Sequence, residues 1–172
     1  TMHLLNTFFA EMTAIIFQHE GMLDKYIGDA IMAVFGVPLK GKHDAHCAIQ
    51  AALQMLRRLR EMNEQRAFGA RQLRIGIGIH SGQVMAGNVG CAERIDYTVI
   101  GDTVNIAARL QELTKEFNVP IVTSAETIQE ARFGNDRAKF LGDTRIRGRE
   151  SSIQVYGIEE TAHAGFSGKA AV

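Results

Sequence analysis

Apolar residues recur at helical spacing in four stretches of the chain. The first stretch is the clearest, because apolar side chains return every third or fourth position until Gly21 ends the pattern. We expect helices over residues 2–19, 43–64, 103–117 and 125–132. Asp102 can cap the third helix, and the fourth begins after Ser124, another residue type suited to a helix start.

Between these helices, polar and apolar positions alternate, as they do in strands that bury one face. The stretch DKYIGDAIMAVFG predicts two short strands, 22–27 and 30–36, joined by a tight turn at Gly28–Asp29. Further strands are expected within residues 71–90 (broken by a turn at Ser81–Gly82), 95–101, 119–125, 139–148 and 151–160. This mixture of helices and strands predicts an α/β (α+β) sandwich, in which helices pack on a mixed sheet.

Glycines alternate with isoleucines in the segment RIGIGIHSG. The isoleucines form the packed face of a strand, whereas Gly76 and Gly78 leave its other face without side chains. A bare face of this kind lets another backbone or a ligand approach closely. It does not predict a dinucleotide site, because no helix opens on the glycines. We interpret His80, which follows them, as a structural residue.

Composition and charge limit the function classes. The chain has 172 residues, 46% of them hydrophobic and 22% charged, which suits one folded domain with a real core. We assign this domain to residues 1–160 and expect 161–172 to be a disordered tail.

Lys plus Arg and Asp plus Glu balance at 19 each, so nucleic acid is not an expected partner. No apolar run reaches the ~18 residues that span a bilayer, and two cysteines without CxxC spacing favour a cytoplasmic setting.

Two segments imitate well-known ligand sites. GVPLKGKH (36–43) approaches the phosphate-loop pattern, but His43 stands where a Ser or Thr would bind magnesium, and Pro38 lacks an N–H for the phosphate cradle. HDAHC (43–47) gathers two histidines and a cysteine, which without further ligands rarely make a zinc site. We interpret both segments as ordinary structure at the start of a helix.

Three separated segments carry groups suited to nucleotide chemistry. Asp29 lies at the tip of the first hairpin, with Lys25 four positions earlier. Asn105 and Arg109 are four apart, so they share one face of the third helix. Arg147 lies between the two closing strands. Each is unremarkable alone, but together they offer a carboxylate for a cation, arginines for phosphates and an amide for orientation.

The segments LLNTFFAEM, DKYIGDAIMAVFGVP, LRIGIGIHSGQVMAGNVG and DYTVIGDTVNIAARL resemble, in order and at suitable spacing, the class III nucleotidyl cyclase catalytic domain. The resemblance covers about residues 2–158. It implies a ferredoxin-like core, two Mg²⁺ (or Mn²⁺) ions and a head-to-tail homodimer. Each active site then lies at the subunit interface and contains groups of both chains.

The resemblance also implies roles for individual residues. Asp29 is similar to one of the two aspartates that hold the metal ions. Lys25 and Thr98 occupy the purine-selecting positions, and the backbone of Val99 faces the base edge. Asn105 and Arg109 resemble the pair that orients the ribose and stabilises the transition state, and Arg147 replaces a triphosphate-binding lysine. These roles are carried over position by position. In the family's arrangement, Asp29 of one subunit shares an active site with the other named residues of the partner subunit.

The identities of Lys25 and Thr98 favour adenine over guanine. Adenine presents an acceptor at N1 and a donor at its 6-amino group, whereas guanine presents the reverse pair. Lys25 only donates and the Thr98 hydroxyl can accept, so the pair matches ATP. A buried mismatch of hydrogen-bond polarity discriminates strongly between substrates.

The chain departs from the family pattern at its start. The segment D-[IV]-x-G-F-[ST], which carries the first metal aspartate on a strand before the first helix, is missing from it. We therefore expect a domain without its first strand, and a weak metal site if Asp29 acts alone. Adenylate cyclase is the leading interpretation. Guanylate cyclase and a non-catalytic, cyclase-like dimerisation or nucleotide-sensing module are the alternatives, and upstream domains would provide any membrane attachment.

Overall fold

The computed structural model describes residues 2–145 and 152–159, and the following account concerns those residues. The helices are α1 (Met2–Gln18), α2 (Asp44–Glu64), α3 (Asp102–Phe117) and α4 (Ala125–Ala131), with a 3₁₀ turn, η1 (Asn135–Arg137). All the predicted helices are therefore confirmed, with small differences at their ends. The expected tail, 161–172, lies outside the described residues.

The strands form one four-stranded sheet and two hairpins. They are β1 (Met22–Ile27), β2 (Ala30–Val34), β3 (Ile77–Ile79), β4 (Met85–Cys91), β5 (Arg94–Ile100), β6 (Ile121–Ser124), β7 (Ala138–Arg145) and β8 (Ser152–Ile158). The larger sheet has the order β3-β6-β8-β7, parallel between β3 and β6 and antiparallel elsewhere. The hairpins β1–β2 and β4–β5 pair only within themselves among the described strands. The mixed α/β class is confirmed, although the strands are distributed over three sheets.

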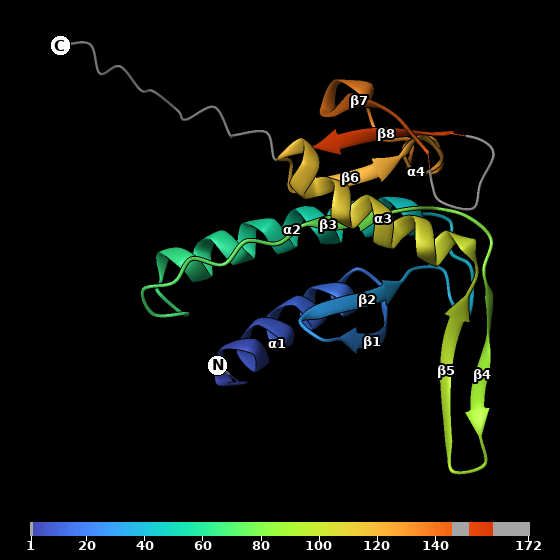
Figure 1. The fold of residues 1–172 in the computed structure, drawn as a ribbon, viewed down its shortest axis with the longest axis horizontal. Helices are drawn as coiled ribbons and strands as arrows, with labels where there is room; N and C mark the ends of the chain where they lie inside the picture. Colours follow the sequence, from blue (N-terminus) through green and yellow to red (C-terminus); the bar gives the residue numbers. More distant parts are fainter. Residues whose placement is uncertain (1, 146–151, 160–172) are drawn as a thin grey trace.

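Helix α2 lies at the centre of the molecule (Figure 1). Its residues Ile49 and Leu53 belong to a core cluster that also contains Ile121 of β6 and Ile158 of β8. Other faces of the same helix contribute Ala51, Leu59 and Met62 to a second cluster, which α1 completes with its apolar stripe. A helix with apolar residues on two faces can join two layers, and α2 thereby connects α1 to the four-stranded sheet.

Helix α3 packs against the sheet through a third cluster, in which Ile106 and Leu110 contact Val122 and Val155. Its approach depends on Gly78 of β3. A Cβ at this position would collide with the carbonyl oxygen of Ala107 and the backbone nitrogen of Gln111. The predicted close approach at this glycine is thus confirmed, and the approaching group is the backbone of α3.

Two local predictions are wrong. Asp102 does not cap α3, because it is the first helical residue and Gly101 is the N-cap, without a side-chain hydrogen bond. The strand expected from residue 71 is reduced to three residues, although its isoleucines still pack inward. Ser124, by contrast, caps α4 as expected, since its hydroxyl accepts a hydrogen bond from the backbone N–H of Thr127.

The hairpin β4–β5 extends away from the rest of the molecule as a long arm (Figure 1). Its strands pair in unbroken register from Met85↔Ile100 to Cys91↔Arg94. The large apolar side chains that this arm exposes are Met85, Val89, Ile95, Tyr97 and Ile100. Exposed apolar side chains concentrated on one element mark a surface that another molecule can cover.

Candidate active site

Asp29 lies at the tip of the β1–β2 hairpin. Ile27 pairs with Ala30, so Gly28 and Asp29 form the two-residue turn that the sequence predicts. Gly28 has a φ of 63°, in the region that glycine tolerates best, and a tight turn of this kind needs such a residue. The turn leaves Asp29 exposed to solvent.

Tyr26 anchors this hairpin to α1. Its ring stacks on Phe9, with 4.3 Å between the ring centroids. Its hydroxyl lies 3.0 Å from the Thr13 hydroxyl, within hydrogen-bonding distance. The strand that carries Lys25 is therefore fixed against the first helix by the residue next to it.

Lys25 and Thr98 are brought together by a carboxylate that the sequence analysis missed. The side chain of Asp24 is completely buried, and its Oδ2 lies 3.4 Å from the Lys25 Nζ. The Thr98 hydroxyl lies 2.8 Å and 2.9 Å from the two oxygens of the same carboxylate and donates its proton to them. The two positions predicted to select the purine, on β1 and β5, thus share one buried carboxylate.

A β-bulge explains why Asp24 faces inward. The register of β1 against β2 shifts between Leu23 and Lys25, so Asp24 is the extra residue of the strand. A bulge breaks the regular alternation of faces and redirects a side chain. Simple alternation along the sequence gives no sign of this, and the only available signal was an aspartate adjacent to Lys25.

Thr98 and Val99 are buried on β5, with 6% and 5% of their surface exposed. Across the β4–β5 ladder, Thr98 pairs with Gly87 and Val99 with Ala86. No atom lies within 4 Å of the place where a Gly87 Cβ would be. There is therefore open space beside Thr98 on the face that directly opposed residues share.

Helix α3 follows β5 directly and carries both Asn105 and Arg109. Asn105 is exposed, whereas Arg109 is partly covered and already paired. Its guanidinium donates a hydrogen bond of 2.8 Å to Glu112 and lies 3.0 Å from Glu116. Hydrogen bonding to Glu112, assisted by the charge of Glu116, raises the pKa of Arg109. Both residues lie on the predicted helix, but the acidic partners of Arg109 were not predicted.

The described residues supply only part of a metal site. No group of three or more His, Cys, Asp or Glu side chains within residues 2–145 and 152–159 is arranged to hold a metal ion. Asp29 offers one hard oxygen ligand, and Mg²⁺ accepts such a ligand only together with others. Two metal ions therefore do not fit the described residues alone. Arg147 lies outside the described residues.

The segment that resembles a phosphate loop (36–43) and His80 both make structural contacts. Gly36 and Gly41 both lie against the side chain of Asp44, and the Gly41 N–H donates to that carboxylate at 2.8 Å. An anionic side chain thus fills the space where a phosphate loop would hold phosphate. The imidazole Nδ1 of His80 lies 2.7 Å from the Ser124 hydroxyl, which gives this histidine a structural hydrogen bond.

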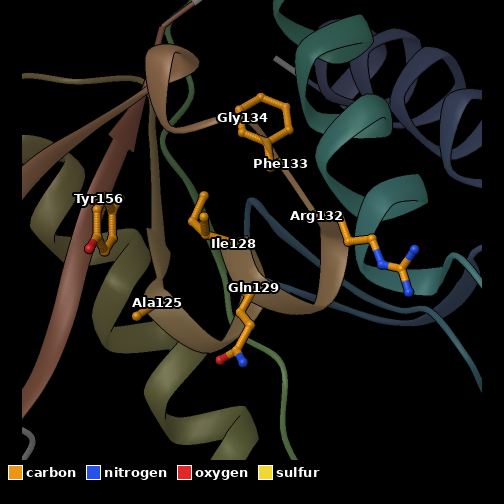
Figure 2. Close-up of a pocket in the computed structure, with 7 residues that line it drawn as sticks. All are labelled: Ala125, Ile128, Gln129, Arg132, Phe133, Gly134 and Tyr156. Atoms are coloured by element: carbon orange, nitrogen blue, oxygen red, sulfur yellow. The ribbon is translucent and has the colours of Figure 1, made fainter.

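A hollow of about 550 Å³ opens beside α4 (Figure 2). Its lining residues are Ala125, Ile128, Gln129, Arg132, Phe133, Gly134 and Tyr156. Of the predicted nucleotide-binding residues that the structure describes, none lines it. Those residues lie instead on the two hairpins and on α3.

The comparison with family models decides the identity. Residues 1–160 match the model described as the adenylate and guanylate cyclase catalytic domain. The chain belongs to this cyclase family. The predicted resemblance is therefore confirmed.

Relatives of this cyclase domain include proteins named as adenylate cyclases and proteins named as guanylyl cyclases. The adenylate cyclase of Anabaena cylindrica is 36% identical over 90% of this chain, which spans 31% of that relative's length. The crystal structure of the adenylyl cyclase CyaB from P. aeruginosa matches with a TM-score of 0.82 at 30% identity, over 94% of this chain and 83% of that one. The crystal structure of the guanylyl cyclase Cya2 matches with a TM-score of 0.78 over the same shares, also at 30% identity.

The cyclase domain contains no helix, in the residues described, that is long and apolar enough to cross a membrane. The structural matches confirm the predicted fold class. The structural neighbours include both adenylyl and guanylyl cyclases. Similarity of fold therefore does not tell whether the substrate carries adenine or guanine, and the residues at the site must decide this.

Proposed function

We propose that this chain is the catalytic domain of an adenylate cyclase, which converts ATP to 3′,5′-cyclic AMP and pyrophosphate. The observation that carries the proposal is the joining of Lys25 and Thr98, far apart in the sequence, through the buried Asp24 carboxylate. Lys25 only donates hydrogen bonds, and it faces an acceptor at adenine N1. Thr98 accepts one from the adenine 6-amino group.

The reaction requires the ribose 3′-oxygen to attack the α-phosphorus of the same nucleotide. Asn105, which is exposed near the start of α3, carries both a donor and an acceptor and orients the ribose. Arg109 contributes a planar fork of donors to phosphate oxygens as charge accumulates on them. To do so, its guanidinium leaves Glu112 or Glu116 for the substrate.

Asp29 contributes one carboxylate oxygen to a divalent metal site. Bound Mg²⁺ or Mn²⁺ would lower the pKa of the attacking hydroxyl and neutralise charge on the leaving pyrophosphate. The hairpin turn suits Asp29 to this role, because it holds the carboxylate free of the fold. We assign the remaining metal ligands to the substrate phosphates and to a second carboxylate beyond the described residues, and Arg147 to the triphosphate.

The active form is a head-to-tail homodimer in which each site combines Asp29 of one chain with Lys25, Thr98, Asn105 and Arg109 of the other. The exposed apolar side chains of the β4–β5 arm support this assembly, because a partner chain would remove them from water. Both cysteines are free, in keeping with a cytoplasmic reaction.

Turnover tests the proposed reaction. The full-length protein is incubated with ATP or GTP and with Mg²⁺ or Mn²⁺, and cyclic products are separated by chromatography. We expect cyclic AMP as the main product. Production of cyclic GMP alone would replace the proposal by guanylate cyclase, whose structural match at a TM-score of 0.78 makes it the second candidate.

A dimer that binds nucleotide without forming a cyclic product would instead support the non-catalytic module. The lack of a complete metal-ligand group among the described residues favours this third possibility. Restoration of turnover by Mn²⁺ would count against it, because a metal that binds more tightly compensates for a weak ligand set.

Complementation tests the shared site. Asp29→Ala and Arg109→Ala should each reduce turnover by about 10²-fold or more. Mixing the two variants should restore part of the activity, because one of the two sites in a mixed dimer is intact. An equal mixture that remains inactive, although size-exclusion chromatography shows dimers, would contradict the interfacial site.

A further inference from the structure

We propose that Asp24 determines purine specificity by fixing the hydrogen-bond polarity of Thr98. Asp24 is here a positioning residue, because it acts through Thr98 rather than by touching the base. The inference rests on the proposed function, since it concerns the same purine pocket. It adds a residue that selects ATP to the pair formed by Lys25 and Thr98.

The position of the Thr98 hydroxyl proton decides whether this group can donate to a base or only accept from it. This hydroxyl lies 2.8 Å and 2.9 Å from the two carboxylate oxygens of Asp24. An ionised carboxylate only accepts hydrogen bonds, so the proton between them belongs to Thr98 and points at Asp24. The Asp24 side chain has no exposed surface, so water does not compete for its oxygens.

A threonine hydroxyl has one proton and two lone pairs, and it can ordinarily face either a donor or an acceptor. Once the proton is committed to Asp24, only the lone pairs of Thr98 remain for a ligand. The adenine 6-amino group donates and fits this arrangement. Guanine O6 accepts, so it would face a lone pair without a proton between the two oxygens.

The same carboxylate lies beside the second base-selecting residue. The Lys25 Nζ is 3.4 Å from Asp24 Oδ2, and the lysine side chain remains 46% exposed. Lys25 is thus oriented by Asp24 while part of its ammonium group stays available to a ligand. The bulge at Asp24 permits this arrangement, because consecutive residues of a regular strand point to opposite faces.

The surroundings of Thr98 leave room for a base. Gly87 is its direct partner across the β4–β5 ladder, and the space above Gly87 is open. Opposed residues of an antiparallel ladder share a face, so a planar ring that lies over Gly87 is next to Thr98, of which 6% is exposed.

Two substitutions of Asp24 separate the effect of its charge from the effect of its capacity to accept a hydrogen bond. Asp24→Asn and Asp24→Ala both remove the charge, but asparagine retains an acceptor oxygen and alanine does not. The full-length protein and both variants are compared by the dissociation constants of ATP and GTP and, separately, by the kcat/KM for each nucleotide. We expect the preference for ATP to fall in the order wild type, Asp24→Asn, Asp24→Ala. The total change should be about tenfold, the value of one hydrogen bond.

The change should include tighter GTP binding as well as weaker ATP binding. If Asp24 had only a structural role, its substitution would weaken the binding of both nucleotides together and leave the ratio of their dissociation constants unchanged. Glu64→Gln, the same charge change on an exposed residue of α2, is the control and should alter neither constant. Circular dichroism and thermal melting show whether each variant is folded.

Thr98→Val provides a second, independent measurement. Valine has no hydroxyl, so in this background Asp24→Ala should change the ATP:GTP ratio less than in the wild type, and any remaining change acts through Lys25. The coupling between the two substitutions measures the part of the Asp24 effect that acts through Thr98. An undiminished effect would overturn the inference, as would equal ratios in wild type and Asp24→Ala.

The binding measurement also separates this inference from the proposed function. If ATP is bound in preference to GTP without turnover, the cyclase proposal fails while the Asp24 variants still test the purine pocket. If the wild type prefers GTP, the Asp24 inference fails even though cyclase activity stands. A chain that binds neither nucleotide overturns both.

Discussion

The four-stranded sheet and the two hairpins divide the molecule into a packed part and an exposed part. Strand β6 is buried over its whole length, and β8 buries four of its seven residues, between α2, α3 and α4. The hairpins expose most of theirs, yet they carry Asp29, Lys25 and Thr98. The packed part gives the domain its stability, whereas the proposed chemistry is placed on elements whose surfaces remain available to a substrate and a second chain.

Substitution in the packed part should have the largest effect on folding. Leu110 is fully buried between α3 and the sheet, so Leu110→Ala should lower the free energy of unfolding by about 2–5 kcal/mol. Urea denaturation measures the change. Leu39→Ala, at a leucine that is 86% exposed, is the control and should change stability by less than about 0.5 kcal/mol.

Gly78 tests how closely α3 must approach β3. Gly78→Ala places a methyl group against the backbone of Ala107 and Gln111, which cannot move aside as a side chain can. We expect a loss of about 1–3 kcal/mol in the free energy of unfolding. Gly87→Ala introduces the same methyl group into open space and should leave stability almost unchanged. Equal effects at the two glycines would contradict this packing.

The ion pair between α1 and α2 should make a smaller contribution. Arg58 donates two hydrogen bonds to Glu11, at 2.8 and 2.9 Å, and they lower the pKa of that carboxyl. A depressed pKa stabilises the fold above the ordinary value of about 4.3, and this stabilisation is lost as the pH falls through the lower folded value.

Glu11→Gln should therefore cost at most about 1 kcal/mol near neutral pH, because both side chains are partly exposed. The difference between variant and wild type should disappear in acid. Thermal melting between pH 3 and 7 measures it, with Glu64→Gln as the control. A difference that does not shrink as the pH falls would show that packing rather than charge is responsible.

The β4–β5 arm should show the smallest effect on folding and a large one on assembly. Ile95 is 61% exposed, so Ile95→Ser should change the stability of the single chain by less than about 0.5 kcal/mol. If the arm joins two chains, the same substitution weakens the dimer and reduces cyclic AMP formation. Analytical ultracentrifugation and turnover assays measure these effects. Leu39→Ser, outside the arm, is the matched control.

The packed part was the more predictable from sequence. Helical periodicity located all four described helices, and the alternation of isoleucine with glycine predicted both the packed face of β3 and the close approach at Gly78. These features follow from local patterns, because burial repeats with the period of the element. The family resemblance, rather than periodicity, supplied the expected roles of Lys25, Thr98 and Arg109.

The burial of Asp24 could not be predicted from local patterns, because it depends on contacts between distant segments. The inward turn of Asp24 arises from a bulge, which breaks the alternation on which strand prediction depends. Its partner, Thr98, is 74 residues away. The acidic partners of Arg109 were within reach of sequence analysis, because Glu112 is three positions along the same helix. The roles of all the predicted site residues, Asp29 and Arg147 among them, stay predictions, as do the metal ions and the dimer.

The pairing of Arg109 with Glu112 and Glu116 has a consequence for the ionic-strength dependence of binding. A phosphate that engages Arg109 replaces a carboxylate, so the arginine exchanges one anionic partner for another instead of gaining its first. Added salt weakens both pairings through the same screening. The contribution of Arg109 to nucleotide affinity should therefore vary less with salt than that of an unpaired arginine. Substitution of both glutamates would restore the steeper dependence.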